Sequence, residues 1–351
     1  MIKPSSIRLE ASTACQLRCP SCPTTTGQIG ASIGTGFLTF ERFKALVDAN
    51  PWVKDVELSN WGEIFLNPHL VRIMAYAHRK RVGLRADNGV NFNTVPDEVL
   101  QALVTYRFQS LVCSIDGASQ ATYAVYRRRG DFDRVIANVR RLNALKSQHR
   151  SERPALTWQF VAFGHNEHEI PAARRLAQEL GMRFVVKLSW DDMYTPETFS
   201  PVRDREAIRR ETGLGVADRR EYHARHGDNY LQRQTCSQLW LLPQINWDGR
   251  VLGCCVNYWG DFGNAFTDGL LESLNGEKLA YARRMLTGVT PAREDIPCTS
   301  CIHYKAMSRD GRWLTRADVE RRRPPMLETL IRKIVWKLRG AAHRLGISRS
   351  R

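Results

Sequence analysis

The chain has 351 residues, of which 43% are hydrophobic, which is enough for one large domain and a smaller one and argues against a disordered or fibrous protein. The start of the chain has no apolar signal-peptide stretch, and no run approaches the roughly 20 apolar residues of a membrane span, so we expect a cytoplasmic protein. The formal net charge is +16, and residues 312–351, with twelve Lys/Arg against three Asp/Glu, carry +9 of it. A polyanionic partner would therefore meet mainly this terminal segment.

Six short runs of β-branched or alternating residues occur in the first half of the chain, and helical patterns lie between them. These runs are 6–11, 56–59, 82–86, 110–115, 156–163 and 183–188. Each strand–helix unit is long enough for a right-handed crossover, which predicts a parallel sheet. We expect an α/β fold in which residues 1–190 form a partial (β/α)6 TIM-like barrel.

The second half of the chain divides into three segments by composition. Residues 191–234 are charged, show little apolar periodicity and are interpreted as a bridging segment. Residues 235–310 predict a small α+β domain with a hairpin, 240–247 and 251–255 around the turn Asp248-Gly249, and a helix near 270–286. Residues 311–351 form a basic tail with the pattern of an amphipathic helix, which either lies on a membrane surface or packs on the fold; the pattern leaves both open.

The positions of the cysteines indicate what chemistry the protein performs. The chain has nine cysteines, and in a reducing compartment they indicate metal or redox chemistry rather than disulfides. Cys113 stands alone on the fourth predicted strand, next to Ser114, so we expect its side chain to face the helices as a core thiol.

Cys15, Cys19 and Cys22 directly follow the first predicted strand, at the end of the barrel where such enzymes place their sites. Three thiolates cannot fill the four irons of a 4Fe-4S cluster, and the open iron can bind and reduce a small chelating ligand. Three cysteines so close together, with no nearby histidine, fit a structural zinc site poorly. The set therefore predicts an open 4Fe-4S cluster.

The C-x3-C-x2-C spacing after the first strand resembles the radical S-adenosylmethionine superfamily. The resemblance implies that the open iron binds S-adenosylmethionine and that a one-electron donor such as flavodoxin or ferredoxin drives its cleavage to a 5′-deoxyadenosyl radical. Trp61-Gly62-Glu63-Ile64 resembles the family's Gly-Gly-Glu-Pro motif, with Glu63 at the position that binds the methionyl ammonium. Asn88 resembles part of its Thr-Asn-Gly turn.

The fourth strand ends in Ser114-Ile-Asp116, and Arg127 follows at the family's spacing. The resemblance implies that Ser114, Asp116 and Arg127 contact ribose or carboxylate. Ser21 stands where the family has an aromatic or large apolar residue near the adenine, so the adenine must be packed by residues elsewhere in the chain.

A second set consists of Cys236, Cys254, Cys298 and Cys301, four thiols that would close one cluster or bind one zinc ion. The Gly249-x4-Cys254 hairpin followed by C-x2-C resembles the twitch form of the SPASM extension, which implies an auxiliary 4Fe-4S cluster. Cys255 has three open roles: substitute ligand, hydrogen-atom donor or small buried residue. The glycine-rich stretch 27–36 is expected to be a flexible lid beside the first set.

These features predict a radical enzyme that abstracts hydrogen from a small-molecule, sugar or lipid-linked glycan substrate, with dehydrogenation or epimerisation at a carbinol carbon. The alternative within the SPASM group is maturation of a ribosomal peptide, although the first strand begins at residue 6 and leaves no room before it for a peptide-recognition domain of about 80 residues. A third possibility is a non-catalytic membrane- or nucleic-acid-binding metalloprotein. Most of the excess charge lies in one terminal segment, which disfavours nucleic acid and fits peripheral contact with the inner face of a membrane.

Overall fold

The structure is a computed structural model that describes residues 1–190, 194–195, 197–227 and 231–320. Contacts divide the chain into two compact units, Met1–Leu314 and Thr315–Arg351. The described part of the second unit holds α15 (Arg316–Val319), which a capping box of Thr315 and Asp318 begins. Most of the amphipathic helix predicted for the basic tail lies outside the described residues.

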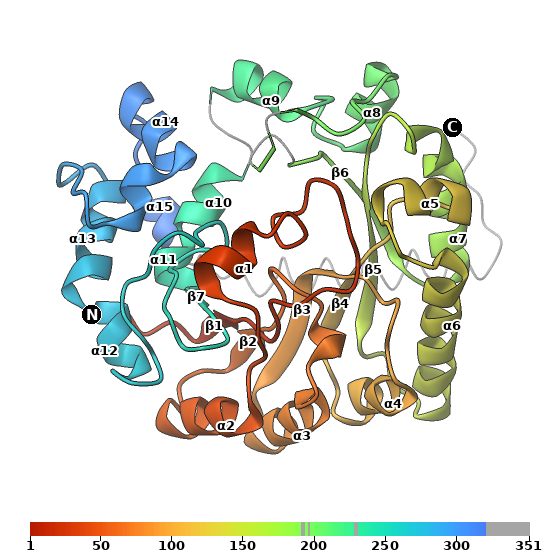
Figure 1. Ribbon diagram of the computed structural model, residues 1–351, viewed down its shortest axis with the longest axis horizontal. Helices are drawn as coiled ribbons and strands as arrows, with labels where there is room; N and C mark the ends of the chain where they lie inside the picture. Colours follow the sequence, from red (N-terminus) through yellow and green to blue (C-terminus); the bar gives the residue numbers. More distant parts are fainter. Residues whose placement is uncertain (191–193, 196, 228–230, 321–351) are drawn as a thin grey trace. The chain divides into compact units, whose positions relative to one another are not determined.

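A parallel sheet of seven strands in the described residues organises the first unit, in the order β6-β5-β4-β3-β2-β1-β7 (Figure 1). The six predicted strands are confirmed: β1 (Ser6–Leu9), β2 (Asp55–Glu57), β3 (Gly83–Val90), β4 (Ser110–Ser114), β5 (Ala155–Val161) and β6 (Arg183–Lys187). Every pairing between neighbours is parallel. The carboxyl ends of the strands therefore meet at one edge.

Helices cover the outer face of this sheet (Figure 1). They are α2 (Phe40–Ala49), α3 (Leu70–Lys80), α4 (Asp97–Thr105), α5 (Gln120–Tyr126), α6 (Phe132–Gln148) and α7 (Ile170–Glu179), with the 3-10 turns η1 (Ile64–Leu66) and η2 (Glu167–Glu169). Alternate strand residues such as Ile7, Leu9 and Leu111 are fully buried beneath them. Cys113 is fully buried on the same face, which confirms the prediction for this thiol.

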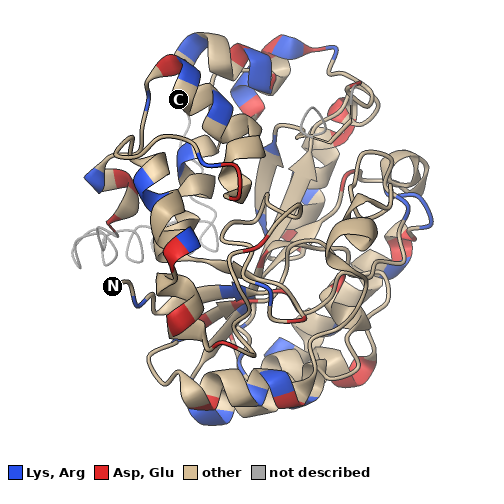
Figure 2. Ribbon diagram, turned by 60° about the vertical axis from the view of Figure 1, so that its left-hand side comes forward, with Lys and Arg blue, Asp and Glu red and all other residues tan. Residues whose placement is uncertain are grey.

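The predicted bridging segment contains helices in its described part. These are α8 (Arg205–Glu211), α9 (Arg219–His226) and α10 (Gln232–Cys236), and the side chains of Asp204 and Asp218 cap the first two. Both signs of charge occur on the outer helices in Figure 2, and Arg205 pairs with Asp218 and Glu221. No helix among the described residues is long and apolar enough to cross a membrane.

The predicted hairpin is present in a shorter form. Residues around Trp240 belong to α11 (Gln238–Leu241), and β7 (Gln244–Ile245) pairs through Ile245 with Val251 across the turn. β7 also pairs with β1 and becomes the seventh strand of the barrel sheet, a pairing that the sequence did not predict. Helices α12 (Leu270–Asn275), α13 (Glu277–Leu286) and α14 (Ile302–Asp310) and the turn η4 (Pro297–Ser300) follow.

The glycine-rich stretch forms helix α1 (Gln28–Ile33), so the expectation of a flexible lid is wrong. Ile29 and Ile33 are buried in a cluster with Trp61 and Leu252. The Arg250 guanidinium donates from Nη2 to the carbonyl oxygen of Ile33 at 2.7 Å. Burial of its isoleucines and this hydrogen bond hold α1 against the loop after β2 and against the hairpin.

Candidate active site

The first three cysteines lie on the loop that follows β1. Cys19 is buried in a cluster with Leu17, Tyr126, Val161 and Phe163. Cys15 and Cys22 are half-buried against this cluster, and the Cys22 amide donates to the carbonyl oxygen of Cys19 at 3.2 Å. The structure therefore brings the three thiols together at the carboxyl ends of the strands.

Two thiols of this loop, Cys15 and Cys19, are costly to ionise without a bound cation. Burial raises the pKa of Cys15 to about 12, and the nearby Glu63 carboxylate adds to the effect. Burial also raises the pKa of Cys19 to about 11, while the charge of Arg127 acts in the opposite direction. A metal centre would overcome this cost, because bound cations stabilise thiolates.

Arg127 reaches the cysteine loop from the end of α5. Its Nε donates to Asp116 Oδ2 at 2.6 Å, and its Nη1 donates to the sulfur of Cys19 at 3.8 Å. Asp116 is fully buried, and its Oδ1 accepts from the Val161 amide at 2.8 Å. Both carboxylate oxygens are thus engaged within the protein, and Asp116 orients Arg127; a contact of Asp116 with a bound cofactor stays a prediction.

Glu63 lies after β2, beside the cysteine loop. Its carboxylate accepts from the Asn91 amide at 2.6 Å and from the Phe65 amide at 3.3 Å, and burial raises its pKa to about 7. A side chain at Gly62 would meet the carbonyl oxygen of Ser12 at 2.4 Å. Glycine is therefore required here, because the chain before Cys15 passes directly over it.

The carboxyl-terminal ends of β3 and β4 meet at Gly89 and Ser114. Gly89 has φ +128, and a Cβ there would lie 2.6 Å from Ser114 Oγ. Asn88 donates from Nδ2 to Asn60 Oδ1 at 2.7 Å, while Gln159 reaches Ser114 Oγ at 3.4 Å. The structure thus gathers the cofactor-binding residues suggested by the sequence at the ends of neighbouring strands.

Aromatic side chains lie beside Ser21, and packing of the adenine by them stays a prediction. The Ser21 hydroxyl lies 2.9 Å from the Tyr126 hydroxyl, and the Tyr126 ring packs on Phe163 with the ring centroids 4.5 Å apart. Phe199 joins them at 5.4 Å from Tyr126. This aromatic wall was not predicted from the sequence, although Tyr126 directly precedes Arg127.

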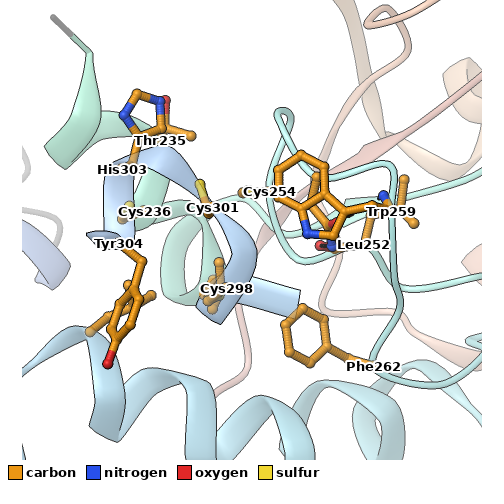
Figure 3. A pocket seen from close by; sticks show the side chains of 13 residues that line it. Thr235, Cys236, Leu252, Cys254, Trp259, Phe262, Cys298, Cys301, His303 and Tyr304 are labelled. Atoms are coloured by element: carbon orange, nitrogen blue, oxygen red, sulfur yellow. Dashed lines mark hydrogen bonds between the residues drawn. The ribbon is translucent and has the colours of Figure 1, made fainter. Parts of the chain in front are cut away.

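The second cysteine set lines one cavity, which Figure 3 shows. Cys236 comes from the end of α10, Cys254 follows the hairpin, Cys298 lies in η4 and Cys301 precedes α14. The cavity has about 380 Å³ of space not filled by atoms, its mouth included. Burial raises the pKa of Cys298 to about 12, and it raises the pKa of Cys236 well above its usual value, the latter also through the other thiols of the set.

Each set fits an iron-sulfur cluster by the chemistry of its donors, three thiols for an open cluster and four for a closed one. Within the described ranges, no group of three or more His, Cys, Asp or Glu side chains is arranged to hold a metal ion. In a 4Fe-4S cluster each thiolate binds a different iron. The cysteine sulfurs therefore lie around the outside of a cube. In a zinc site, by contrast, all the cysteine sulfurs converge on one metal ion.

Cys255 is not among the residues that line the four-cysteine cavity, although it directly follows Cys254. Gln238 donates from Nε2 to its sulfur at 3.4 Å and accepts from its amide at 2.8 Å, and Asn60 Nδ2 donates to its carbonyl oxygen at 3.0 Å. Lys187, at the end of β6, is close enough for Cys255 to influence its pKa. Lys187 was not predicted as a site residue, although a charge at the carboxyl end of a barrel strand is a signal for a site.

Comparisons with known proteins agree with this arrangement. Residues 9–176 match the family model of the radical SAM superfamily, and residues 236–302 match that of the SPASM iron-sulfur cluster-binding domain. No curated protein sequence matches the chain significantly.

Solved structures share the fold at low identity. Streptococcus suis SuiB bound to S-adenosylmethionine has a TM-score of 0.61 and 13% identity, over 86% of this chain and 72% of SuiB. SuiB bound to its precursor peptide SuiA gives 0.61 and 14%, over 87% and 71%. Native anSMEcpe with bound AdoMet gives 0.56 and 14%, over 86% and 87%.

The two family matches cover the barrel with its first cysteine set and the region of the second set. These families bind 4Fe-4S clusters and S-adenosylmethionine, the cofactors for which the two cysteine sets are suited. The chain belongs to the radical S-adenosylmethionine superfamily, as an enzyme with a SPASM auxiliary iron-sulfur domain.

Proposed function

We propose that the enzyme cleaves S-adenosylmethionine reductively and abstracts a hydrogen atom from a carbinol carbon of a small-molecule or glycan substrate, which is then dehydrogenated or epimerised. The observation that carries this proposal is that Cys255, which directly follows Cys254 of the second set, is joined to the loop after β2 by a hydrogen bond from Asn60 Nδ2 to its carbonyl oxygen. Burial raises the pKa of Tyr194, and the thiols Cys255, Cys22 and Cys254 add to the shift, so one phenol lies near both sets.

The cofactors would be held by side chains from both parts of the first unit. Cys15, Cys19 and Cys22 would hold the first cluster, and the auxiliary cluster would be held by Cys236, Cys254, Cys298 and Cys301. The residues around S-adenosylmethionine would be Gly62, Glu63, Asn88, Ser114, Asp116 and Arg127. When bound, these groups supply a 5′-deoxyadenosyl radical, with flavodoxin, ferredoxin or a similar protein as the electron source.

The fate of the substrate depends on the groups around Cys255. A substrate that has lost one hydrogen atom becomes a ketone by losing a proton to solvent and one electron, which the auxiliary cluster would accept, or an epimer by gaining a hydrogen atom on its other face. Cys255 can donate that atom because an S–H bond is weaker than a carbinol C–H bond. The thiyl left behind regains its hydrogen from one electron of the external reductant and one proton of the solvent. The two hydrogen bonds to Gln238 hold Cys255 in place for this role.

A lipid-linked glycan is one form that the substrate could take. Its support is the +9 charge of residues 312–351, which would attract an anionic membrane surface.

The second candidate is maturation of a ribosomal peptide. Its support is the fold shared with SuiB, which has been solved with a precursor peptide. Both candidates need the same radical and differ in the substrate that the barrel admits.

Anaerobic reconstitution tests the first step. We expect about eight irons per chain, and formation of 5′-deoxyadenosine when dithionite is added with S-adenosylmethionine. Sugars, cyclitols and their lipid-linked forms should then be compared with short peptides for a product that is an isomer or is lighter by one hydrogen molecule. Protein that binds zinc alone, or leaves S-adenosylmethionine intact with every candidate, would contradict the proposal.

A further inference from the structure

The inner face of the barrel sheet is polar. The strand register places Arg8 beside Glu57, Glu57 beside Arg85, and Arg85 beside Ser110. Side chains alternate along a strand, so these residues face away from the apolar side that the helices cover. Closed (β/α)8 barrels usually fill their interior with branched apolar side chains. The row of charged side chains in this barrel departs from that pattern.

Arg8 has charged hydrogen-bond donors without acceptors. Its Nε and Nη1 atoms are buried and have no hydrogen-bond partner in the part of the chain that the structure describes. Its neighbour Glu57 is already bound by the hydroxyl and amide of Ser59 and by the Asp87 amide. Burial raises the pKa of Glu10 to about 8, so this neighbour is mostly uncharged at neutral pH. Unpaired donors of a buried cation are costly, and a ligand anion would remove that cost.

Lys187 brings a second cation to the same face. The register pairs Lys187 with Val161, two residues beyond Gln159 on the inner side of β5. Its Nζ donates to Gln159 Oε1 at 2.9 Å, and within the described residues no carboxylate forms an ion pair with it. Burial lowers the pKa of Lys187 to about 8. Cys255 and Asp116 oppose this shift, and the charge of Arg8 adds to it, so the two cations are near enough to repel each other.

We propose that Arg8 and Lys187 form an anion-binding subsite on the inner face of the barrel, and that this subsite holds a carboxylate or phosphate group of the substrate beside Cys255. Two cations and the Gln159 amide group would surround the anion, with charge-assisted hydrogen bonds from the free Nε and Nη1 of Arg8. The subsite rests on the proposed function in one respect only, which is that the substrate binds against the inner face of the barrel sheet.

Binding of simple probes tests the subsite without turnover. Glycerol 3-phosphate and gluconate carry the two anionic groups on polyols, and glycerol is the uncharged control. Each would be titrated calorimetrically, under anaerobic conditions, into the reconstituted full chain and its Arg8→Met and Lys187→Met variants. Arg183→Met is the matched control, because Arg183 lies on β6 on the same side as Lys187 and is exposed.

We expect at least one anionic probe to bind, glycerol not to bind, and each Met variant to weaken the anion about tenfold or more, while Arg183→Met changes nothing. The probe that binds identifies the anion as phosphate or carboxylate. Failure of both anions to bind, equal binding of glycerol, or unchanged affinity in both folded Met variants would overturn the subsite.

Two controls keep the result interpretable. Iron content and circular dichroism report folding, and Arg8→Lys, which keeps the charge, should retain most of the affinity even if Arg8→Met does not fold. Cleavage of S-adenosylmethionine is measured in parallel. Cleavage without anion binding rejects only the subsite, whereas anion binding without cleavage rejects only the proposed radical chemistry.

Discussion

The Arg127 guanidinium donates to the sulfur of Cys19 across 3.8 Å. The same guanidinium forms an ion pair of 2.6 Å with Asp116, whose side chain is fully buried. The family motif that ends β4 is thereby connected to the cysteine loop after β1 through one side chain. A positive charge at this place stabilises thiolate ligands, because it offsets part of the cost of burying negative charge.

Replacing Arg127 with Met should destabilise the fold and lower iron loading of the first cluster. The change leaves the Asp116 carboxylate buried without a partner, which costs about 3–5 kcal/mol in the free energy of unfolding. Arg127→Lys keeps the charge but lacks the planar guanidinium that donates to both Asp116 and Cys19. Its stability and iron loading should therefore lie between those of the wild type and of Arg127→Met. Thermal unfolding and iron content per chain are the measurements. If Arg127→Met unfolds at the wild-type temperature and binds the wild-type amount of iron, the ion pair with Asp116 contributes little to stability or to iron loading.

Replacing Cys301 with Ala should remove about half of the iron, because the second set loses one of four ligands while the first set is untouched. Cleavage of S-adenosylmethionine without substrate should persist, since it depends on Cys15, Cys19 and Cys22. The matched control is Cys113→Ala, which removes a buried thiol on the helix side of the sheet and should keep all of the iron. Full iron content in Cys301→Ala would exclude this cysteine as a ligand.

Replacing Cys255 with Ala separates the two outcomes proposed for the substrate. If Cys255 donates a hydrogen atom, turnover in deuterated water places deuterium in the product of the wild-type enzyme, and the variant accumulates 5′-deoxyadenosine without the epimer. Unchanged turnover and no deuterium in the product would reject the donor role and favour dehydrogenation. Gln238→Leu removes both hydrogen bonds to Cys255 and should, like Cys255→Ala, lower the amount of epimer formed.

Glu10 should make the fold less stable as the pH rises. Burial raises its pKa from 4.5 to about 8, so the folded state keeps a proton that the unfolded state releases between these values. The stabilising contribution is therefore complete below about pH 4.5 and is lost as the pH rises through about 8.

The variant Glu10→Gln removes this dependence. Near pH 9 we expect it to be more stable than the wild type by about 2 kcal/mol or more, with a much smaller difference near pH 5. Thermal unfolding at both pH values measures the effect, and Glu98→Gln, at an exposed position on α4, serves as the control. A difference that does not grow with pH would show that Glu10 is ionised in the folded state.

The strands and the first cysteine set could be predicted because their signals are local. The run Ala155–Val161 alternates apolar and polar residues along most of its length, and the three cysteines lie within eight residues on a loop after β1. The prediction of a flexible lid at 27–36 was wrong, because Gln28–Ile33 form the helix α1. Its glycines weaken a helix in isolation, and burial of Ile29 and Ile33 against Trp61 and Leu252 outweighs that loss.

The sequence alone determined the order of the strands along the chain, the spacing of the cysteines and the family motifs, because each depends on residues close together in the chain. Only the tertiary structure decided that β7 joins β1, that the Tyr126 hydroxyl reaches Ser21, and that Arg8 and Lys187 share one face. Each of these depends on packing between segments more than a hundred residues apart. Many local patterns are compatible with several such packings, and burial of the whole core selects one.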